Sequence, residues 1–265
     1  MSIERKLWLG LIALLAVSFA VLLWVGGEIH RQMPPVPEQV RSSAGEVLYT
    51  RENIETGRQV WQSIGGHQLG SIWGHGSYVA PDWTADWLHR EAVAWLELEA
   101  KRVHGRGYAD LQPDEQAALN TRLAREVREN SYDANTGTVT VSVQRAAAMR
   151  EVAQHYIALF GNDPELLDLR RAYAMKNGTV KEAEHREVLN AFFWWSAWSA
   201  VTQRPGQEIS YTANWPYEPL VGNEPAPNLL MWTVFSVLFL IAGIALLGWH
   251  YAVNHERDED PKLPL

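Results

Sequence analysis

The stretch at residues 65–83, GGHQLGSIWGHGSYVAPDW, is the most distinctive part of the sequence. It holds five glycines within the twelve positions 65–76, which indicates a backbone that turns sharply or approaches another group closely. Three large aromatic residues, Trp73, Tyr78 and Trp83, lie in it, and a helix start follows directly. A generic glycine-rich loop is not usually so dense in tryptophan, so this block is the first candidate for a functional surface.

The sequence beyond the block predicts a mainly helical domain. Apolar residues recur with helical spacing, and prolines, acidic residues and glycines stand where helices begin and end. The pattern Thr179-x-x-Glu182 is typical of a capping box before a long helix. Helices are predicted over residues 82–103, from Pro113 onwards, and over residues 144–160, 163–178 and 179–203. The alternating segment 138–143 predicts a short strand or hairpin.

Two clusters within these helices have a structural interpretation. Asp86, Glu91, Glu97 and Glu99 are spread around their helix, which favours a solvated face with ion pairs over a catalytic carboxylate pair. Residues 192–198 hold five aromatic side chains over one and a half turns, too wide for one buried stripe. We expect them to pack on both the domain core and the membrane-proximal side rather than form an electron path.

Two long apolar segments flank the domain. Residues 7–25, LWLGLIALLAVSFAVLLWV, carry no charge, and residues 229–251, LLMWTVFSVLFLIAGIALLGWHY, are interrupted only by His250. About 20 apolar residues span the hydrocarbon core of a bilayer. The first segment has Arg5 and Lys6 before it, but its apolar run is too long for a signal peptide and no cleavage-site pattern follows. Both segments are therefore predicted to be transmembrane helices.

Basic residues outside the spans predict cytoplasmic termini. Arg5 and Lys6 precede the first span, and Arg257 and Lys262 follow the second. The long intervening stretch then lies on the extracytoplasmic side, with a stiff proline-rich tether at residues 34–37. The predicted organisation is a cytoplasmic N-terminus at 1–6, transmembrane helices at 7–25 and 229–251, a periplasmic domain at 26–228 and a cytoplasmic tail at 252–265.

Composition excludes several classes of function. The 31 acidic and 23 basic residues give a net charge of −8 without a basic stripe, which argues against nucleic-acid binding. The chain has no cysteine, which excludes disulfides, thiolate metal sites, iron–sulfur clusters and covalently attached haem. Thirteen tryptophans suit a membrane-associated protein. None of the nine histidines lies in the middle of a span, and His67 and His75 alone are weak evidence for a metal.

Two segments carry a resemblance to a known family. Residues 74–91, GHGSYVAPDWTADWLHRE, resemble the hallmark of quinol-dependent nitric oxide reductases, and residues 214–223, NWPYEPLVGN, are similar to the same family. The resemblance covers essentially the whole chain but only the N-terminal portion of the family's longer polypeptide. It implies a mainly α membrane protein with minor β, in which two transmembrane helices flank an extracytoplasmic cytochrome c-like domain. Residues 229–251 would be the first helix of the catalytic bundle.

A second resemblance implies that the domain carries no haem. The cytochrome subunit of two-subunit relatives has a tryptophan, then Cys-x-x-Cys-His, then a run similar to residues 74–81. Ungapped alignment from Trp61 to Tyr78 places the haem-binding positions on Gly66, Leu69 and Gly70. The resemblance therefore implies a cytochrome scaffold without its cofactor.

The resemblance also implies what surrounds the domain. In the family, haem b, haem b3 and a non-haem iron are held by later membrane helices, calcium lies beside the cytochrome-like domain, and quinol donates electrons. The expected partners are a histidine-rich, multi-span catalytic core, the lipid of the bacterial inner membrane, and quinol at the core. The possible calcium ligands here are Gly76 and Tyr78, and the expected interface residues are Trp73, His75, Gly76, Tyr78 and Trp83.

Because this chain lacks the iron ligands, it is not expected to reduce nitric oxide to nitrous oxide alone. The core is either a separate polypeptide, or the chain is a truncated product. The alternative is a two-span membrane sensor or ligand-binding protein with an extracytoplasmic domain, since receptors share this layout. Only about 14 residues follow Tyr251, which is too few for a signalling domain.

Overall fold

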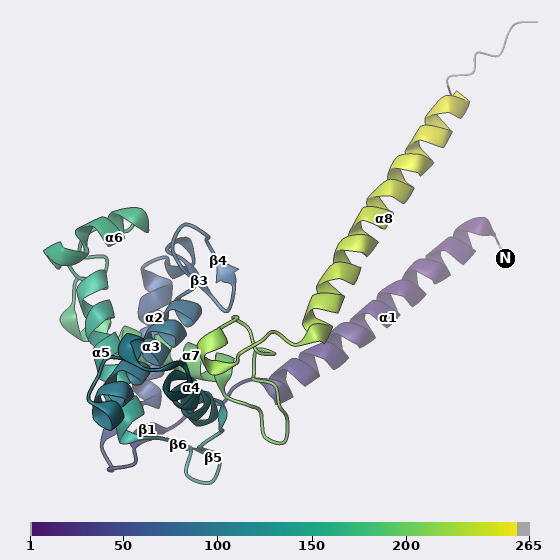
Figure 1. Ribbon diagram of the computed structural model, residues 1–265. Coiled ribbons are helices and arrows are strands. Elements are labelled where there is room, and N and C mark those ends of the chain that lie inside the picture. The colour runs from purple at the N-terminus through teal and green to yellow at the C-terminus, as the bar shows by residue number, and fades with distance from the viewer. Residues whose placement is uncertain (1, 259–265) are drawn as a thin grey trace, which may run out of the picture.

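The computed structural model describes residues 2–258 and shows a helical domain with two long helices projecting from the same side (Figure 1). The α-helices are α1 (Ile3–Gln32), α2 (Arg51–Ser63), α3 (Trp83–His104), α4 (Pro113–Arg128), α5 (Val143–Phe160), α6 (Leu167–Ala172), α7 (Ala183–Val201) and α8 (Pro227–Asp258). The strands are β1 (Gln39–Ser42), β2 (Val47–Thr50), β3 (Ser71–Ile72), β4 (His75–Gly76), β5 (Tyr132–Asp133) and β6 (Thr138–Val141). The second half of the predicted cytoplasmic tail lies outside the described residues.

The projecting helices α1 and α8 are long and apolar enough to cross a membrane. The candidate spans are Glu4–Gln32 and Leu230–His255, and in each the most apolar window is entirely unburied by the rest of the protein. Apolar side chains exposed along a whole helix need lipid or another protein around them. The chain is therefore a membrane protein, and both helices extend beyond the apolar segments that the sequence predicts.

Helix α7 forms the centre of the domain. All residues from 189 to 201 are buried, and α2, α3, α4 and α5 pack around it. A helix that is apolar on all sides is a buried helix, which is why its five aromatic residues form no single stripe. Gly57 lets α2 approach closely, because a Cβ there would lie 2.1 Å from the carbonyl oxygen of Val188.

The membrane-proximal side of α7 holds the proline-rich segment. The indole Nε1 of Trp195 donates a hydrogen bond to the carbonyl oxygen of Pro35 at 2.9 Å, and Pro37 is buried. The segment is therefore packed against the domain rather than suspended between domain and membrane.

The minor β structure consists of a four-stranded sheet with the order β2-β1-β6-β5 and a two-stranded sheet of β3 and β4. Strand β1 pairs antiparallel with β2 and parallel with β6, and β5 and β6 form an antiparallel pair. The predicted strand at 138–143 is confirmed as β6, which stops at Val141 because Ser142 caps α5.

The predicted helices at 82–103 and 144–160 and from Pro113 onwards are confirmed as α3, α5 and α4. The predicted helix at 163–178 is wrong in extent, because a 3₁₀ turn precedes α6 and Ala174 adopts a positive φ of 52° beyond its end. The capping box is also wrong. The Thr179 hydroxyl donates to the carbonyl oxygen of Lys176, and Glu182 itself occupies the N-cap of α7.

Candidate functional site

The glycine-rich block folds into a small hairpin at the edge of the domain. Strands β3 and β4 pair antiparallel, and Trp73 and Gly74 connect them with positive φ angles of 53° and 78°. At Gly76 the φ angle is 145°, and a Cβ would lie 2.2 Å from the carbonyl oxygen of Gly70. Only glycine fits there, so the glycine content reflects backbone packed directly on backbone.

Asp82 holds this hairpin against the start of α3. Its Oδ1 accepts a hydrogen bond from the Ala85 amide at 3.1 Å, which caps the helix. Its Oδ2 accepts from the Ser71 hydroxyl at 2.8 Å and from the Gly74 amide at 2.6 Å. One carboxylate therefore fixes both the helix terminus and the turn of the hairpin.

Replacing Asp82 by alanine is expected to lower the free energy of unfolding by about 2 kcal/mol and to loosen the hairpin. Amide hydrogen exchange measured by mass spectrometry should rise across residues 71–78. Asp163→Ala removes another N-cap carboxylate, on an exposed 3₁₀ turn, and is the matched control. Unchanged exchange in the hairpin of Asp82→Ala, or an equal rise in the control, would contradict this role.

The predicted interface residues lie in different environments. Tyr78 is 92% exposed, and His75 and Gly76 are also exposed, while Trp73 is half-buried. The Trp73 indole donates to the carbonyl oxygen of Ser196 at 2.9 Å, so it anchors the hairpin to α7. The expectation that Trp83 contributes to an interface is wrong, because its side chain is fully buried in the domain.

Trp83 lies at the centre of an aromatic cluster. Its ring stacks on Phe193 with a centroid distance of 5.7 Å and lies 5.2 Å from Phe160. Trp61, also fully buried, lies 6.3 Å from Trp83 and 5.5 Å from Phe193. Because the cluster joins residues from four helices, it is the core that fixes the position of the glycine-rich block.

Two glycines of the block lie directly against this cluster. A Cβ at Gly66 would lie 2.1 Å from the indole of Trp61, and a Cβ at Gly70 would lie 2.4 Å from the indole nitrogen of Trp83. These separations are far below van der Waals contact, so neither position accepts a side chain without rearrangement. The tryptophan rings occupy the space that side chains at these positions would need.

Sequence reasoning missed part of the exposed surface beside the hairpin. Trp215 packs on Gly74, where a Cβ would lie 3.0 Å from its indole nitrogen, and it remains 40% exposed. Tyr217 and Val79 are each 58% exposed. Trp215 and Tyr217 belong to the segment 214–223, and the resemblance of that segment to the same family is the signal that could have joined it to the hairpin.

The four carboxylates of α3 form ion pairs as expected, and the side chain of Glu97 is 40% exposed, but the expectation that Glu91 and Glu99 face solvent is wrong. The side chains of Glu91 and Glu99 are 3% and 0% exposed. Glu91 pairs with Arg145 at 2.6 Å and accepts from the Trp87 indole at 2.8 Å. Burial and the charge of Glu91 raise the pKa of nearby Tyr49. Glu91 is paired within the core, and Glu99 is paired with the half-exposed Arg102 and Arg122, so both carboxylates have a structural role.

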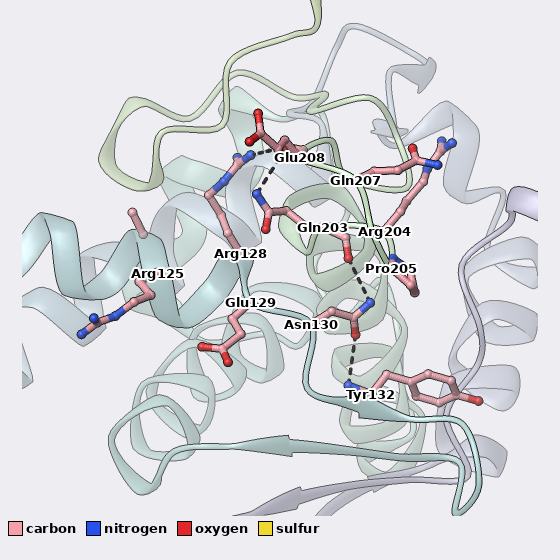
Figure 2. Close-up of a pocket in the computed structure, with 12 residues that line it drawn as sticks. Arg125, Arg128, Glu129, Asn130, Tyr132, Gln203, Arg204, Pro205, Gln207 and Glu208 are labelled. Atoms are coloured by element: carbon pink, nitrogen blue, oxygen red, sulfur yellow. Dashed lines mark hydrogen bonds between the residues drawn. The ribbon is translucent and has the colours of Figure 1, made fainter.

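A cavity of about 870 Å³ lies between the end of α4 and residues 203–208. Figure 2 shows that the guanidinium groups of Arg125, Arg128 and Arg204 point in different directions. Arg128 donates to the carbonyl oxygen of Glu208 at 3.0 Å, and the Asn130 amide donates to that of Gln203 at 2.9 Å. These side chains bind the loop to the domain and do not converge on a ligand.

No side-chain cluster suited to a metal ion is present within residues 2–258, where three or more His, Cys, Asp or Glu would have to meet. His67 and His75 come together, but Nδ1 of His67 lies 3.2 Å from the carbonyl oxygen of His75. The imidazole of His67 therefore contacts the backbone of His75 and not its imidazole.

The comparison with protein families accounts for the domain as a whole. The family model for the NorB cytochrome c-like domain of nitric oxide reductase matches residues 37–217. A comparison with curated proteins gives no significant match. The matched region begins just after α1 and includes the hairpin, the aromatic cluster and α7. The chain thus belongs to the NorB family of nitric oxide reductase, with a cytochrome c-like domain between two candidate membrane helices.

Proposed function

We propose that this chain is a haem-free docking module of a respiratory nitric oxide reductase that receives electrons from quinol. The domain covers the outer face of a histidine-rich, multi-span catalytic core in the bacterial inner membrane. The observation that carries this proposal is the exposed apolar surface on a rigidly held hairpin, within a domain of the NorB family. A two-span sensor is not favoured, because the family match is to a reductase domain.

The docking face consists of residues that the described chain leaves exposed. They are His75, Gly76, Tyr78, Val79, Trp215 and Tyr217. Exposed aromatic residues of this kind are enriched at protein interfaces. The hairpin is held by Asp82 and Trp73, so docking requires little ordering of the backbone, which lowers its entropic cost.

The packing at Gly66 and Gly70 supports the haem-free state. If these positions correspond to the haem-attaching cysteine and the ligating histidine of related cytochromes, both side chains are missing here. A Cβ at Gly70 would lie 2.4 Å from the indole nitrogen of Trp83, so a histidine side chain does not fit at this position without rearrangement. Without the two cysteines and the histidine, these positions offer a haem neither covalent attachment nor the motif's iron ligand, so no electron transfer through this domain is proposed.

The catalytic cofactors belong to the complete enzyme. Haem b, haem b3 and a non-haem iron require histidine ligands within the membrane. The histidines of the two spans, His30, His250 and His255, lie at the helix ends. In the proposed assembly, reduction of nitric oxide therefore takes place on other membrane helices.

A calcium ion at Gly76 and Tyr78 is compatible with the structure only as a shared site. Calcium takes six to eight oxygen ligands, commonly including carboxylates. Gly76 can offer a carbonyl oxygen, and Tyr78 can offer a carbonyl and a phenol oxygen. The nearby Asp82 carboxylate already accepts hydrogen bonds from the hairpin and from the first turn of α3. The remaining ligands, carboxylates above all, would come from the core.

Co-purification tests the docking role. The full chain, tagged and expressed with the multi-span core of the same organism, is expected to recover that core in equal amount. Val79→Asp places a charge in the docking face and should reduce recovery about tenfold or more, since an unpaired buried charge weakens an interface. Val47→Asp, on an exposed edge strand, is the matched control. Equal recovery with both variants, or no recovery by the unmodified chain, would refute the proposal.

A further inference from the structure

A second, largely apolar cavity of about 350 Å³ lies beside the docking face. It is bounded by α2, α7, the hairpin and the first residues after α1. Its apolar walls include Met33, Pro34, Trp61, Trp73, Phe192 and Trp195. The rings are held in place, because the centroids of Trp73 and Trp195 lie 5.4 Å apart and the Trp195 indole is hydrogen-bonded to the Pro35 carbonyl oxygen. The cavity is therefore a preformed site of the size that small ligands use.

The position of α1 places this cavity at the membrane surface. The candidate span Glu4–Gln32 has 29 residues, and at 1.5 Å per residue it is about 43 Å long. A bilayer with its headgroups is about 40–45 Å thick, and membrane helices tilt by about 20° on average. The helix therefore ends, at Gln32, within the headgroup layer. Met33 and Pro34, which follow directly, line the cavity, so it opens at headgroup level.

The charge at the cavity favours an anion. Arg58 lines it and is exposed, and its side chain forms no hydrogen bond or ion pair with the described residues. Gln62, His67 and His75 supply further polar groups, and none of the lining residues, all within residues 2–258, is acidic. An unpaired guanidinium above an apolar cavity at the membrane surface complements an amphiphile with a negative headgroup.

We propose that this cavity binds one anionic phospholipid from the bilayer. Its phosphate lies on Arg58, and its glycerol and upper acyl chain lie against Trp73, Trp195 and Met33. The lipid would hold the domain at a fixed height above the membrane, beside the docking face, with which the cavity shares His75.

Photolabelling in proteoliposomes tests this inference. The full chain is reconstituted with a trace of anionic phospholipid carrying a diazirine on its upper acyl chain, and labelled peptides are mapped by mass spectrometry. Helix α8 serves as the internal reference, because any membrane lipid labels it. We expect label at Met33 and at Trp73. Arg58→Gln should lower the ratio of label in the cavity peptides to label in α8 about fivefold, which is the factor that one basic residue contributes near an anionic surface.

The control is Arg41→Gln, which removes another exposed, unpaired arginine from strand β1 and should leave the ratio unchanged. A zwitterionic lipid with the same acyl chain should label the cavity about fivefold less. Label confined to the two spans would overturn the proposal and indicate that the cavity binds a polypeptide partner instead of a lipid. Equal labelling by both lipids would also overturn it, as would competition by soluble glycerol phosphate, which would indicate a free phosphate site.

Discussion

Replacing Arg145 by methionine is expected to lower the free energy of unfolding by about 3–5 kcal/mol. Arg145 and Glu91 form an ion pair at 2.6 Å in which both side chains are almost fully buried. Removal of the arginine leaves the Glu91 carboxylate in the core, with the Trp87 indole as its remaining hydrogen-bond donor. An unpaired buried charge is among the most destabilising changes that a single substitution makes.

Thermal unfolding of the full chain in detergent, followed by near-ultraviolet circular dichroism, measures this effect. For a domain of this size the midpoint should fall by about 10 °C. Arg150→Met is the matched control on the same helix, because Arg150 and Glu46 form an ion pair whose side chains are both 51% exposed. Exposed pairs contribute about 0–1 kcal/mol, so its midpoint should barely move. Adding Glu91→Gln to Arg145→Met should recover part of the loss, and equal shifts in the two arginine variants would contradict the buried pair.

Replacing Gly70 by alanine is expected to destabilise the domain by about 3–5 kcal/mol. The residue has a φ of 145°, and a Cβ there would lie 2.4 Å from the Trp83 indole and 2.5 Å from the carbonyl oxygen of Pro81. The substitution therefore combines backbone strain with overpacking against the aromatic cluster. Trp83 would have to move, and with it the start of α3.

Gly105→Ala separates these two contributions. Gly105 also has a positive φ, of 66°, but a Cβ there meets nothing within 4 Å. Its cost should be about 1 kcal/mol, from the left-handed backbone alone. Denaturant unfolding of the full chain should thus distinguish the two variants clearly. Similar midpoints would mean that the space beside Gly70 is not filled as the structure shows.

Local sequence patterns predicted the elements whose signals are local. Helix α3 follows its apolar spacing and the Asp82 cap, and β6 follows its alternation and the Ser142 cap. The same reasoning failed at Thr179, because a side chain that suits a cap can bond elsewhere. No element was predicted for residues 38–64, although the cap formed by Thr50 and Asn53 marks the start of α2.

The environment of the site residues could not be predicted in the same way. Glu91 was expected in solvent because its partner, Arg145, lies 54 residues away in the chain. Trp83 was expected at a surface because Phe160 and Phe193, which enclose it, lie on other helices. Burial depends on such long-range contacts, whereas the family resemblance gave the scaffold and the importance of the hairpin.

The central claim is that this cytochrome c-like domain holds no haem and that nitric oxide is reduced on other membrane helices. The direct measurement is made on the full chain, purified from haem-replete cells that attach haem to cytochromes c and placed in quinol-containing liposomes. We expect no Soret absorption from bound haem, and loss of nitric oxide no faster than in empty liposomes. Haem bound at one per chain, or nitric oxide consumed with quinol as donor, would contradict the claim.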